Sequence, residues 1–220
     1  MKLLNSCYII GAGDFSFKNF HPHKNDMIIC ADGGYDKIDT KKYNVSYVIG
    51  DNDSISIPQT LIPNILYKSE KDETDMDLAV RKAIDLGFDK IKIFGGYGDR
   101  PDHFLANIQL MARYSKQKIN IVLYADNFIA ICIYNQKIHF KKTDKRKTLS
   151  IFSLDNKTED VCIKGLKYEI TNAKLTNDFA LGVSNQSIGT EATIQSGKGM
   201  MLIISYDEIA NNNYEILDIK

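Results

Sequence analysis

Short apolar runs separated by polar turns mark the first half of the chain. Four of them end in a turn that contains Gly or Asp, and a fifth follows near residue 120. Apolar runs of this length between turn signals are typical of buried strands. We therefore predict five strands, at Cys7–Ile10, Met27–Ala31, Tyr47–Ile49, Ile91–Phe94 and Ile119–Tyr124.

Two stretches between these runs carry helical periodicity. In the first, apolar side chains recur on one helical face at Met76, Val80, Ala83 and Ile84. The second begins at Pro101, a residue suited to a first helical turn. Its apolar positions are Phe104, Leu105, Ile108, Met111 and Ala112. Strands that alternate with helices predict an α/β fold, with a mostly parallel sheet flanked by helices.

After residue 125 the pattern changes to short, β-branched runs separated by turns. The runs are 128–134, 137–140, 148–154, 161–163, 180–183, 191–195 and 200–206. None shows convincing helical periodicity, so they predict an all-β, sandwich-like second domain. We expect an α/β domain over residues 1–126 and a β-sandwich domain over residues 127–220. The basic run 141–147 favours a charged hairpin that protects a sheet edge over an anion or RNA site.

Composition narrows the class of protein. Of the 220 residues, 44% are hydrophobic and 25% are charged, which excludes collagen-like, mucin-like and largely disordered chains. Lys plus Arg equals Asp plus Glu at 28 each, and this balance argues against binding to duplex nucleic acid. No run approaches the roughly 20 apolar residues of a membrane-spanning helix. The four cysteines contain no CxxC pair, so we expect reduced core thiols in a cytoplasmic protein.

In open α/β sheets, ligands bind beyond the carboxyl ends of the strands. The first candidate cluster there is Gly50-Asp51-Asn52-Asp53-Ser54. Residues two apart in a strand end point to the same side, roughly 7 Å apart at Cα. Asp51 and Asp53 could therefore share one cation, which would remove their repulsion. An Asx turn with solvated carboxylates fits the spacing equally well.

The second cluster, residues 71–77, precedes the first predicted helix. Thr74 and Asp77 have the spacing of a capping box, so Asp77 is assigned to capping. Asp75 stands in a run of acids that exceeds what capping requires, which makes it a candidate ligand for a cation.

Two glycine-containing turns complete the set of clusters. The loop from Gly95 to His103 lies between a predicted strand and a predicted helix, where backbone N–H groups form an anion site. Arg100 beside it suits phosphate recognition. The turn Ala31-Asp32-Gly33-Gly34 allows either close approach to a ligand or simply a tight bend. Together the clusters indicate a Mg²⁺-dependent enzyme acting on a phosphorylated nucleotide.

The order and the residue sequences of these clusters resemble the motifs of the thiamine pyrophosphokinase family. That family carries ADGG, GDxDS, D-x-TD and GGxGxRxDH followed by LAN. The matching segments here are 31–34, 50–54, 72–75, 95–103 and 105–107. The second half adds Gly165-Leu166-Lys167-Tyr168 and Ser184-Asn185, which are similar to the family's GLK-aromatic and SN elements. Two residues depart from the family: Asn52 replaces the usual Phe, and Tyr168 replaces the Trp of some relatives.

The resemblance implies transfer of the terminal diphosphoryl group of ATP to the hydroxyethyl oxygen of thiamine. It implies a homodimer with sites between subunits, and Mg²⁺ held by Asp51, Asp53 and Asp75. Arg100 and Asp102 would be catalytic. ATP would contact Asp32, Gly33, Gly34, Asp51, Asp53, Thr74, Asp75, Gly95, Gly96, Gly98, Arg100 and Asn107. Thiamine would contact Asp102, His103, Tyr168, Ser184 and Asn185.

Three alternatives stay open. The enzyme could act on another heterocyclic alcohol, such as a pterin, with the acidic cluster kept and a different second-domain pocket. It could instead be a non-catalytic thiamine or nucleotide sensor, although a sensor does not need the full acidic set with Arg100. For Tyr168 itself, alternation with Leu166 and Ile170 also fits a strand residue packed in the core.

Overall fold

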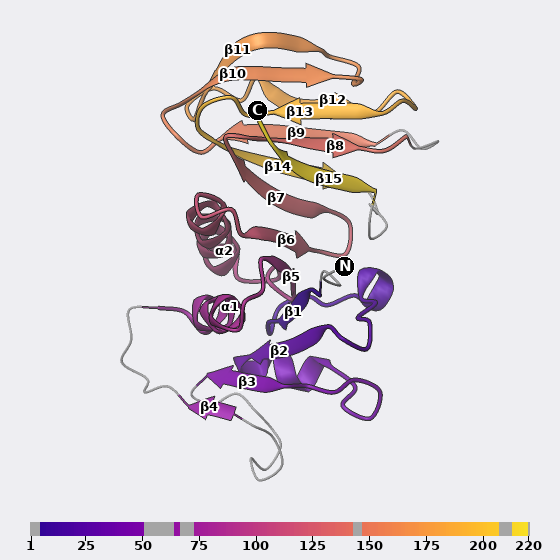
Figure 1. Ribbon diagram of the computed structural model, residues 1–220, viewed down its shortest axis with the longest axis vertical. Helices are drawn as coiled ribbons and strands as arrows, with labels where there is room; N and C mark the ends of the chain where they lie inside the picture. The colour runs from indigo at the N-terminus through magenta and orange to yellow at the C-terminus, as the bar shows by residue number, and fades with distance from the viewer. Residues whose placement is uncertain (1–4, 51–63, 67–72, 143–146, 207–212, 220) are drawn as a thin grey trace. The chain divides into compact units, whose positions relative to one another are not determined.

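A computed structural model describes residues 5–50, 64–66, 73–142, 147–206 and 213–219. For residues 64–66 only the backbone is described. The chain divides into two compact units (Figure 1). The first comprises Met1–Leu110 and Ile121–Asp126, and the second comprises Met111–Asn120 and Asn127–Lys220.

A sheet with parallel pairing organises the first unit. Its strand order is β6-β5-β1-β2-β3-β4, and β1 pairs in parallel with both β2 and β5. The strands are β1 (Cys7–Ile10), β2 (Met27–Ala31), β3 (Tyr47–Gly50), β4 (Asn64–Leu66), β5 (Lys90–Phe94) and β6 (Asn120–Tyr124). All four side chains of β1 are buried, which explains its unbroken apolar run, because a central parallel strand is covered on both faces.

The predicted helices are both present, as α1 (Asp75–Asp85) and α2 (Pro101–Ser115). Thr74 caps α1, because its Oγ1 accepts a hydrogen bond from the Asp77 backbone N–H at 3.2 Å. The buried face of α1 includes Val80 and Ala83 of the predicted apolar stripe. Two short 3₁₀ helices, η1 (Phe17–Asn19) and η2 (Asp32–Lys37), complete the unit.

The second unit contains two sets of antiparallel strands. One has the order β12-β9-β14-β7 and the other β11-β10-β13-β8-β15. The strands are β7 (Ile129–Tyr134), β8 (Gln136–Phe140), β9 (Thr148–Ser153), β10 (Lys157–Lys164), β11 (Ile170–Thr176), β12 (Gly182–Gln186), β13 (Ala192–Gln195), β14 (Met200–Tyr206) and β15 (Tyr214–Asp218). The mixed α/β first half and the separate antiparallel second part confirm the predicted class at this level.

The thiols follow the expected pattern for the most part. Cys7, Cys30 and Cys132 are buried and unbridged, and burial raises the pKa of Cys30 and of Cys132 to about 12. Cys162 is only partly buried, and its Sγ lies 3.4 Å from the Asn172 side-chain oxygen. Among the described residues, no helix is long and apolar enough to cross a membrane.

Candidate functional site

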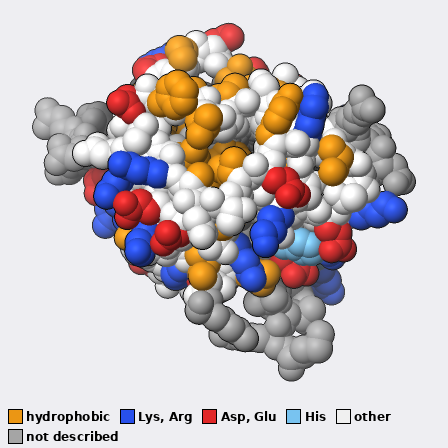
Figure 2. All heavy atoms as spheres, turned by 90° about the horizontal axis from the view of Figure 1, so that it is seen from above, with side chains coloured by type: hydrophobic (Ala, Val, Ile, Leu, Met, Phe, Trp, Pro, Cys, Tyr) orange, Lys and Arg blue, Asp and Glu red, His pale blue; other side chains and the backbone are white. Residues whose placement is uncertain are grey.

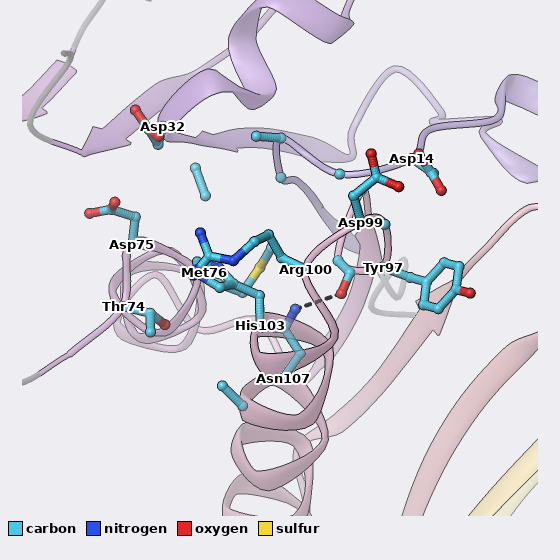
Figure 3. A pocket seen from close by; sticks show the side chains of 18 of the residues that line it. Asp14, Asp32, Thr74, Asp75, Met76, Tyr97, Asp99, Arg100, His103 and Asn107 are labelled. Carbon is cyan, nitrogen blue, oxygen red and sulfur yellow. Dashed lines mark hydrogen bonds between the residues drawn. The ribbon is translucent and has the colours of Figure 1, made fainter. Parts of the chain in front are cut away.

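A cavity of about 560 Å³ opens at the carboxyl ends of the parallel strands in the first unit (Figure 3). The loops after β1, β2 and β5 line it, together with the first turns of α1 and α2. This is the edge of the sheet where ligands bind in open α/β folds. Two helix N-termini at the same cavity favour anionic ligands, because the unpaired N–H groups and the dipole are positive there.

Two glycine-containing loops are joined along one wall of this cavity. The backbone N–H groups of Gly11, Gly13 and Asp14 donate to the carbonyls of Phe94, Gly95 and Tyr97 at 2.8, 2.9 and 2.7 Å. These bonds continue the β1–β5 pairing past the strand ends. Gly95 has φ +64°, and a Cβ there would lie 2.2 Å from the carbonyl oxygen of Gly11, so no other residue fits without moving this wall.

The buried side chain of Asn107 supports the same loop from α2. Its Nδ2 donates to the carbonyl oxygen of Gly96 at 2.7 Å, and the residue also lines the cavity. The predicted ATP residue Asn107 therefore holds the glycine loop directly, as the dashed line in Figure 3 marks.

Arg100 and Asp102 form a two-pronged ion pair at the start of α2. Arg100 Nε donates to Asp102 Oδ1 at 3.0 Å, and Nη2 donates to Oδ2 at 2.7 Å. Both side chains are exposed, at 68% and 62%. The hydrogen bonds from Arg100 lower the pKa of Asp102 to about 2, and the carboxylate raises the pKa of Arg100. Arg100 lines the cavity, whereas Asp102 is not among the residues that form its wall.

Acidic side chains stand on the other side of the cavity. Asp32 and Asp75 both line it and come from η2 and α1 (Figure 3). The Asp32 Oδ1 atom is buried and has no hydrogen-bond partner among the described residues. A buried carboxylate oxygen without a donor fits a hard cation, which takes oxygen ligands.

Two of the three predicted Mg²⁺ ligands, Asp51 and Asp53, lie outside the described residues, as do residues 71 and 72 of the second cluster. The described residues alone contain no group of three His, Cys, Asp or Glu side chains placed to hold a metal ion. Among the described residues, the fit of the site to Mg²⁺ therefore rests on Asp32 and Asp75, which line the same cavity as Arg100.

The remaining predicted residues of the first unit also fall at the cavity. Gly95, Gly96, Gly98, Thr74 and His103 line it. Gly33 and Gly34 are not among the lining residues, and both are buried in η2. A Cβ on Gly34 would lie 1.9 Å from the carbonyl oxygen of Ile10, so glycine allows the close packing at that position.

Several lining residues were not predicted. The loop 11–14 has a sequence signal, since Gly-Ala-Gly-Asp follows an apolar run, and all four of its residues line the cavity. Asp99 lies inside the predicted glycine loop and stands near Asp14 in Figure 3. Lys37 carried no sequence signal, because it reaches the cavity only through the turn of η2.

The candidate thiamine residues of the second unit form their own group. Asn185 is buried and bonds to the backbone of Tyr168, whose side chain is 57% exposed. The chain bends at Gly165 and residues 165–169 form no strand, so the expected alternation with Leu166 does not apply. Leu166 is buried while Tyr168 is not, and the interpretation of Tyr168 as a core residue is wrong.

Comparison with known proteins identifies the family on both halves of the chain. The family described as "Thiamin pyrophosphokinase, catalytic domain" matches residues 21–123, and "Thiamin pyrophosphokinase, vitamin B1 binding domain" matches residues 135–201. Together these matches cover more than half of the 220 residues.

Individual relatives agree with this assignment. A thiamine pyrophosphokinase of Bacillus subtilis (strain 168) is 32% identical over 139 residues, which are 63% of this chain and 65% of the relative, just under two thirds of its length. Thiamin pyrophosphokinase 1 of Caenorhabditis elegans is 21% identical over 193 residues, 81% of this chain and 79% of that protein.

Solved structures extend the similarity to the fold. The crystal structure of thiamine pyrophosphokinase from Bacillus subtilis superposes with a TM-score of 0.82 at 25% identity, covering 93% of this chain and 100% of that chain. The thiamin pyrophosphokinase from Candida albicans gives 0.74 at 18% identity, covering 92% and 89%. With both family domains matched in order on one chain, this protein belongs to the thiamine pyrophosphokinase family.

Proposed function

We propose that this protein transfers the diphosphoryl group of ATP to the hydroxyethyl oxygen of thiamine, forming thiamine diphosphate and AMP. Family membership supports the reaction. The observation that carries the assignment is the 560 Å³ cavity, which is lined by the glycine loop, by Arg100 and by several acidic residues that include Asp32 and Asp75. A cavity of this size and polarity suits a nucleotide bound with a divalent cation.

The phosphate end of ATP would lie against the loop from Gly95 to Gly98. Backbone N–H groups and the N-terminus of α2 offer positive charge there, and Arg100 adds a planar, two-pronged donor. Transfer of a phosphoryl-type group requires positioning and charge neutralisation more than covalent chemistry. The loop and Arg100 would therefore stabilise charge that develops on the transferred group.

We assign Mg²⁺ to Asp51, Asp53 and Asp75; of these, Asp75 lines the cavity together with Asp32. When bound, Mg²⁺ would neutralise phosphate charge and help to orient the chain of phosphates. Without a cation, these carboxylates would oppose the binding of ATP, because like charges repel at short distance.

The ion pair of Arg100 with Asp102 gives each residue a second state. Exposed ion pairs contribute little to stability. ATP phosphates can therefore replace Asp102 as the partner of Arg100 with only a small loss of free energy. Asp102 would then be available to orient the thiamine hydroxyl or to accept its proton. While paired, Asp102 is a weak base, because its pKa is held at about 2.

The pairing itself predicts a change that can be measured without substrate. In Arg100→Ala, the pKa of Asp102 is expected to rise from about 2 toward the ordinary value of an aspartate, because its two donors are lost. Carboxyl-carbon NMR across an acid titration measures it. An unchanged pKa would show that the N-terminus of α2, and not Arg100, lowers the pKa of Asp102. It would contradict the proposal that Arg100 changes its partner from Asp102 to the ATP phosphates.

Thiamine would be held by Asp102, His103, Tyr168, Ser184 and Asn185. The exposed ring of Tyr168 is suited to a cationic heterocycle, and it already has Lys167 Nζ at 5.2 Å from its centroid.

We further propose a homodimer. Four large apolar side chains in residues 179–188 are exposed, and Figure 2 shows apolar side chains gathered on the face that it presents. The four are Phe179, Leu181, Val183 and Ile188. An apolar surface of this kind marks an interaction site, and a second copy of the chain would cover it.

The unbridged buried thiols agree with the expected cytoplasmic location.

Tyr168 gives a direct test of the thiamine assignment. Tyr168→Leu is expected to weaken thiamine binding by ~0.5–2 kcal/mol, the range for a cation over an aromatic ring. The melting temperature and the KM for ATP should hardly change, because the side chain is 57% exposed. Tyr168→Trp should preserve or tighten binding. Thiamine titrations and thermal melts measure both; unchanged thiamine affinity in Tyr168→Leu would exclude Tyr168 from the site.

The proposed reaction is tested by incubating the purified protein with ATP and Mg²⁺ and measuring AMP with and without thiamine. We expect AMP that depends on thiamine. AMP formed with a pterin alcohol or a thiamine analogue but not with thiamine would indicate the other heterocyclic-alcohol enzyme. Thiamine binding without any AMP would indicate a sensor, and either result would contradict the proposal.

A further inference from the structure

Strand β12 contains an irregularity next to the thiamine candidates. Gly182 lies opposite Ile151 of β9 and Asn185 lies opposite Leu149, so three steps along β12 face two along β9. Ser184 lies within this segment with φ +61°, in the left-handed region. One extra residue on one strand is a β-bulge, a device that turns the following side chain to a new direction.

The bulge is followed by a buried amide. Asn185 is only 4% exposed, although Ser184 before it is exposed. Its Oδ1 accepts the backbone N–H of Tyr168 at 3.0 Å and that of Gln186 at 2.8 Å. Its Nδ2 donates to the carbonyl oxygen of Tyr168 at 2.7 Å. One side chain thus bonds both backbone groups of Tyr168, as a neighbouring strand would, and both lone pairs of its oxygen are used.

Other contacts fix the rest of the bend. A Cβ on Gly165, where φ is +75°, would lie 1.9 Å from the carbonyl oxygen of Glu191. The Gly165 N–H donates to Glu169 Oε1 at 2.6 Å, and the Lys167 N–H donates to the Gln186 carbonyl at 2.8 Å. The backbone that carries Tyr168 is therefore held at several points.

Above this fixed backbone, the Tyr168 ring itself is largely exposed. Residues that only fill a core do not leave an aromatic face in solvent. A rigid support below an exposed aromatic ring is the arrangement that a ligand-binding residue requires.

We infer that Asn185 is a positioning residue for thiamine: it holds the Tyr168 backbone so that the ring is presented to the substrate in one orientation. This inference rests on the proposed function. Asn185 would thus affect thiamine binding indirectly, through its two hydrogen bonds with the Tyr168 backbone and its one hydrogen bond with Gln186.

Removing the amide should affect one substrate selectively. In Asn185→Ala, we expect the KM for thiamine to rise roughly tenfold, within the range of a lost aromatic–cation contact. The values of kcat and of the KM for ATP should stay within about twofold. The variant loses binding energy for thiamine that is the same in the ground state and in the transition state. Steady-state kinetics with each substrate varied separately measures this split.

The sequence offers a spectroscopic reporter for the ring position itself. The chain contains no Trp, so Tyr168→Trp introduces a single indole. Thiamine should quench its emission in a saturable titration. In the double variant with Asn185→Ala, we expect lower anisotropy and greater quenching by acrylamide before any thiamine is added, and a weaker thiamine titration.

A matched control separates positioning from general damage. Gln136 is another buried amide of the second unit, and its Nε2 donates to Asp218 Oδ1 at 3.2 Å, away from the bend. Gln136→Ala should lower the melting temperature without changing the KM for thiamine. Should Asn185→Ala not fold, Asn185→Ser keeps a small polar side chain that is too short to bond both backbone groups of Tyr168; it should show an effect in the same direction.

Failure of the Asn185 inference and failure of the proposed reaction would give different results. An unchanged KM for thiamine in both Asn185 variants, or an equal change in Gln136→Ala, would overturn the inference. So would an indole at position 168 whose anisotropy does not depend on Asn185. AMP formation without thiamine quenching would remove Tyr168 and Asn185 from the site and leave the reaction standing, whereas an absence of AMP would contradict the reaction.

Discussion

Asp75→Asn is expected to lower kcat at least 100-fold at saturating ATP and Mg²⁺. Asp75 lines the cavity from the first turn of α1, as Asp32 does from η2. Loss of a preorganised charge that stabilises a transition state costs ~10²–10³ in rate. An amide keeps the shape of the side chain but ligates Mg²⁺ more weakly. Rate measurements over a range of Mg²⁺ concentrations check this result.

The control for Asp75→Asn is Asp77→Asn. Asp77 lies on the same helix, is buried, and does not line the cavity. Its substitution should reduce helix stability slightly, by ~0.3–1 kcal/mol for a carboxylate near a helix N-terminus, and should leave kcat nearly unchanged. An Asp75→Asn enzyme that keeps more than about a tenth of the wild-type kcat would count against direct ligation, since tenfold is only ~1.4 kcal/mol.

Arg100→Lys carries the second large expected effect. Lysine keeps the positive charge and loses the planar fork that now bonds both oxygens of Asp102. If that fork contacts the transferred phosphates in the transition state, kcat should fall by ~10²-fold, and more than the KM for ATP rises. Initial rates with ATP varied at saturating thiamine separate the two parameters.

Arg113→Lys, in the last turn of the same helix, is the matched control. It makes the same chemical change outside the cavity, and both kinetic parameters should remain close to those of the wild type. The reverse pattern in Arg100→Lys, a large rise in the KM for ATP with kcat unchanged, would limit Arg100 to ground-state binding of ATP.

Much of the fold could be predicted because burial and periodicity agree along the chain. All four residues of β1 are buried, and α1 begins after the Thr74 cap and buries Met76, Val80 and Ala83 of the predicted apolar stripe. Strands β11 and β15 were missed for the opposite reason. Both lie at the edges of their sheet, and most of their side chains are at least partly exposed, so neither shows a continuous apolar run.

The site could be predicted where adjacent residues carry the chemistry. The glycine loop with Arg100 and the acid at Asp75 were identified, and both line the cavity. The contact of Asn185 with Tyr168 could not be predicted, because it joins residues 17 positions apart through a bulge. The pairing of Arg100 with Asp102 depends on side-chain orientation, which a linear pattern does not contain.

The most direct measurement of the central claim follows the phosphates of ATP. The protein is incubated with thiamine, Mg²⁺ and ATP labelled at either the α or the γ phosphorus, and the products are separated. Transfer of a diphosphoryl group places the γ label in thiamine diphosphate and leaves the α label in AMP, in equal amounts. A γ label recovered in thiamine monophosphate together with α-labelled ADP, or no labelled thiamine product at all, would contradict the account.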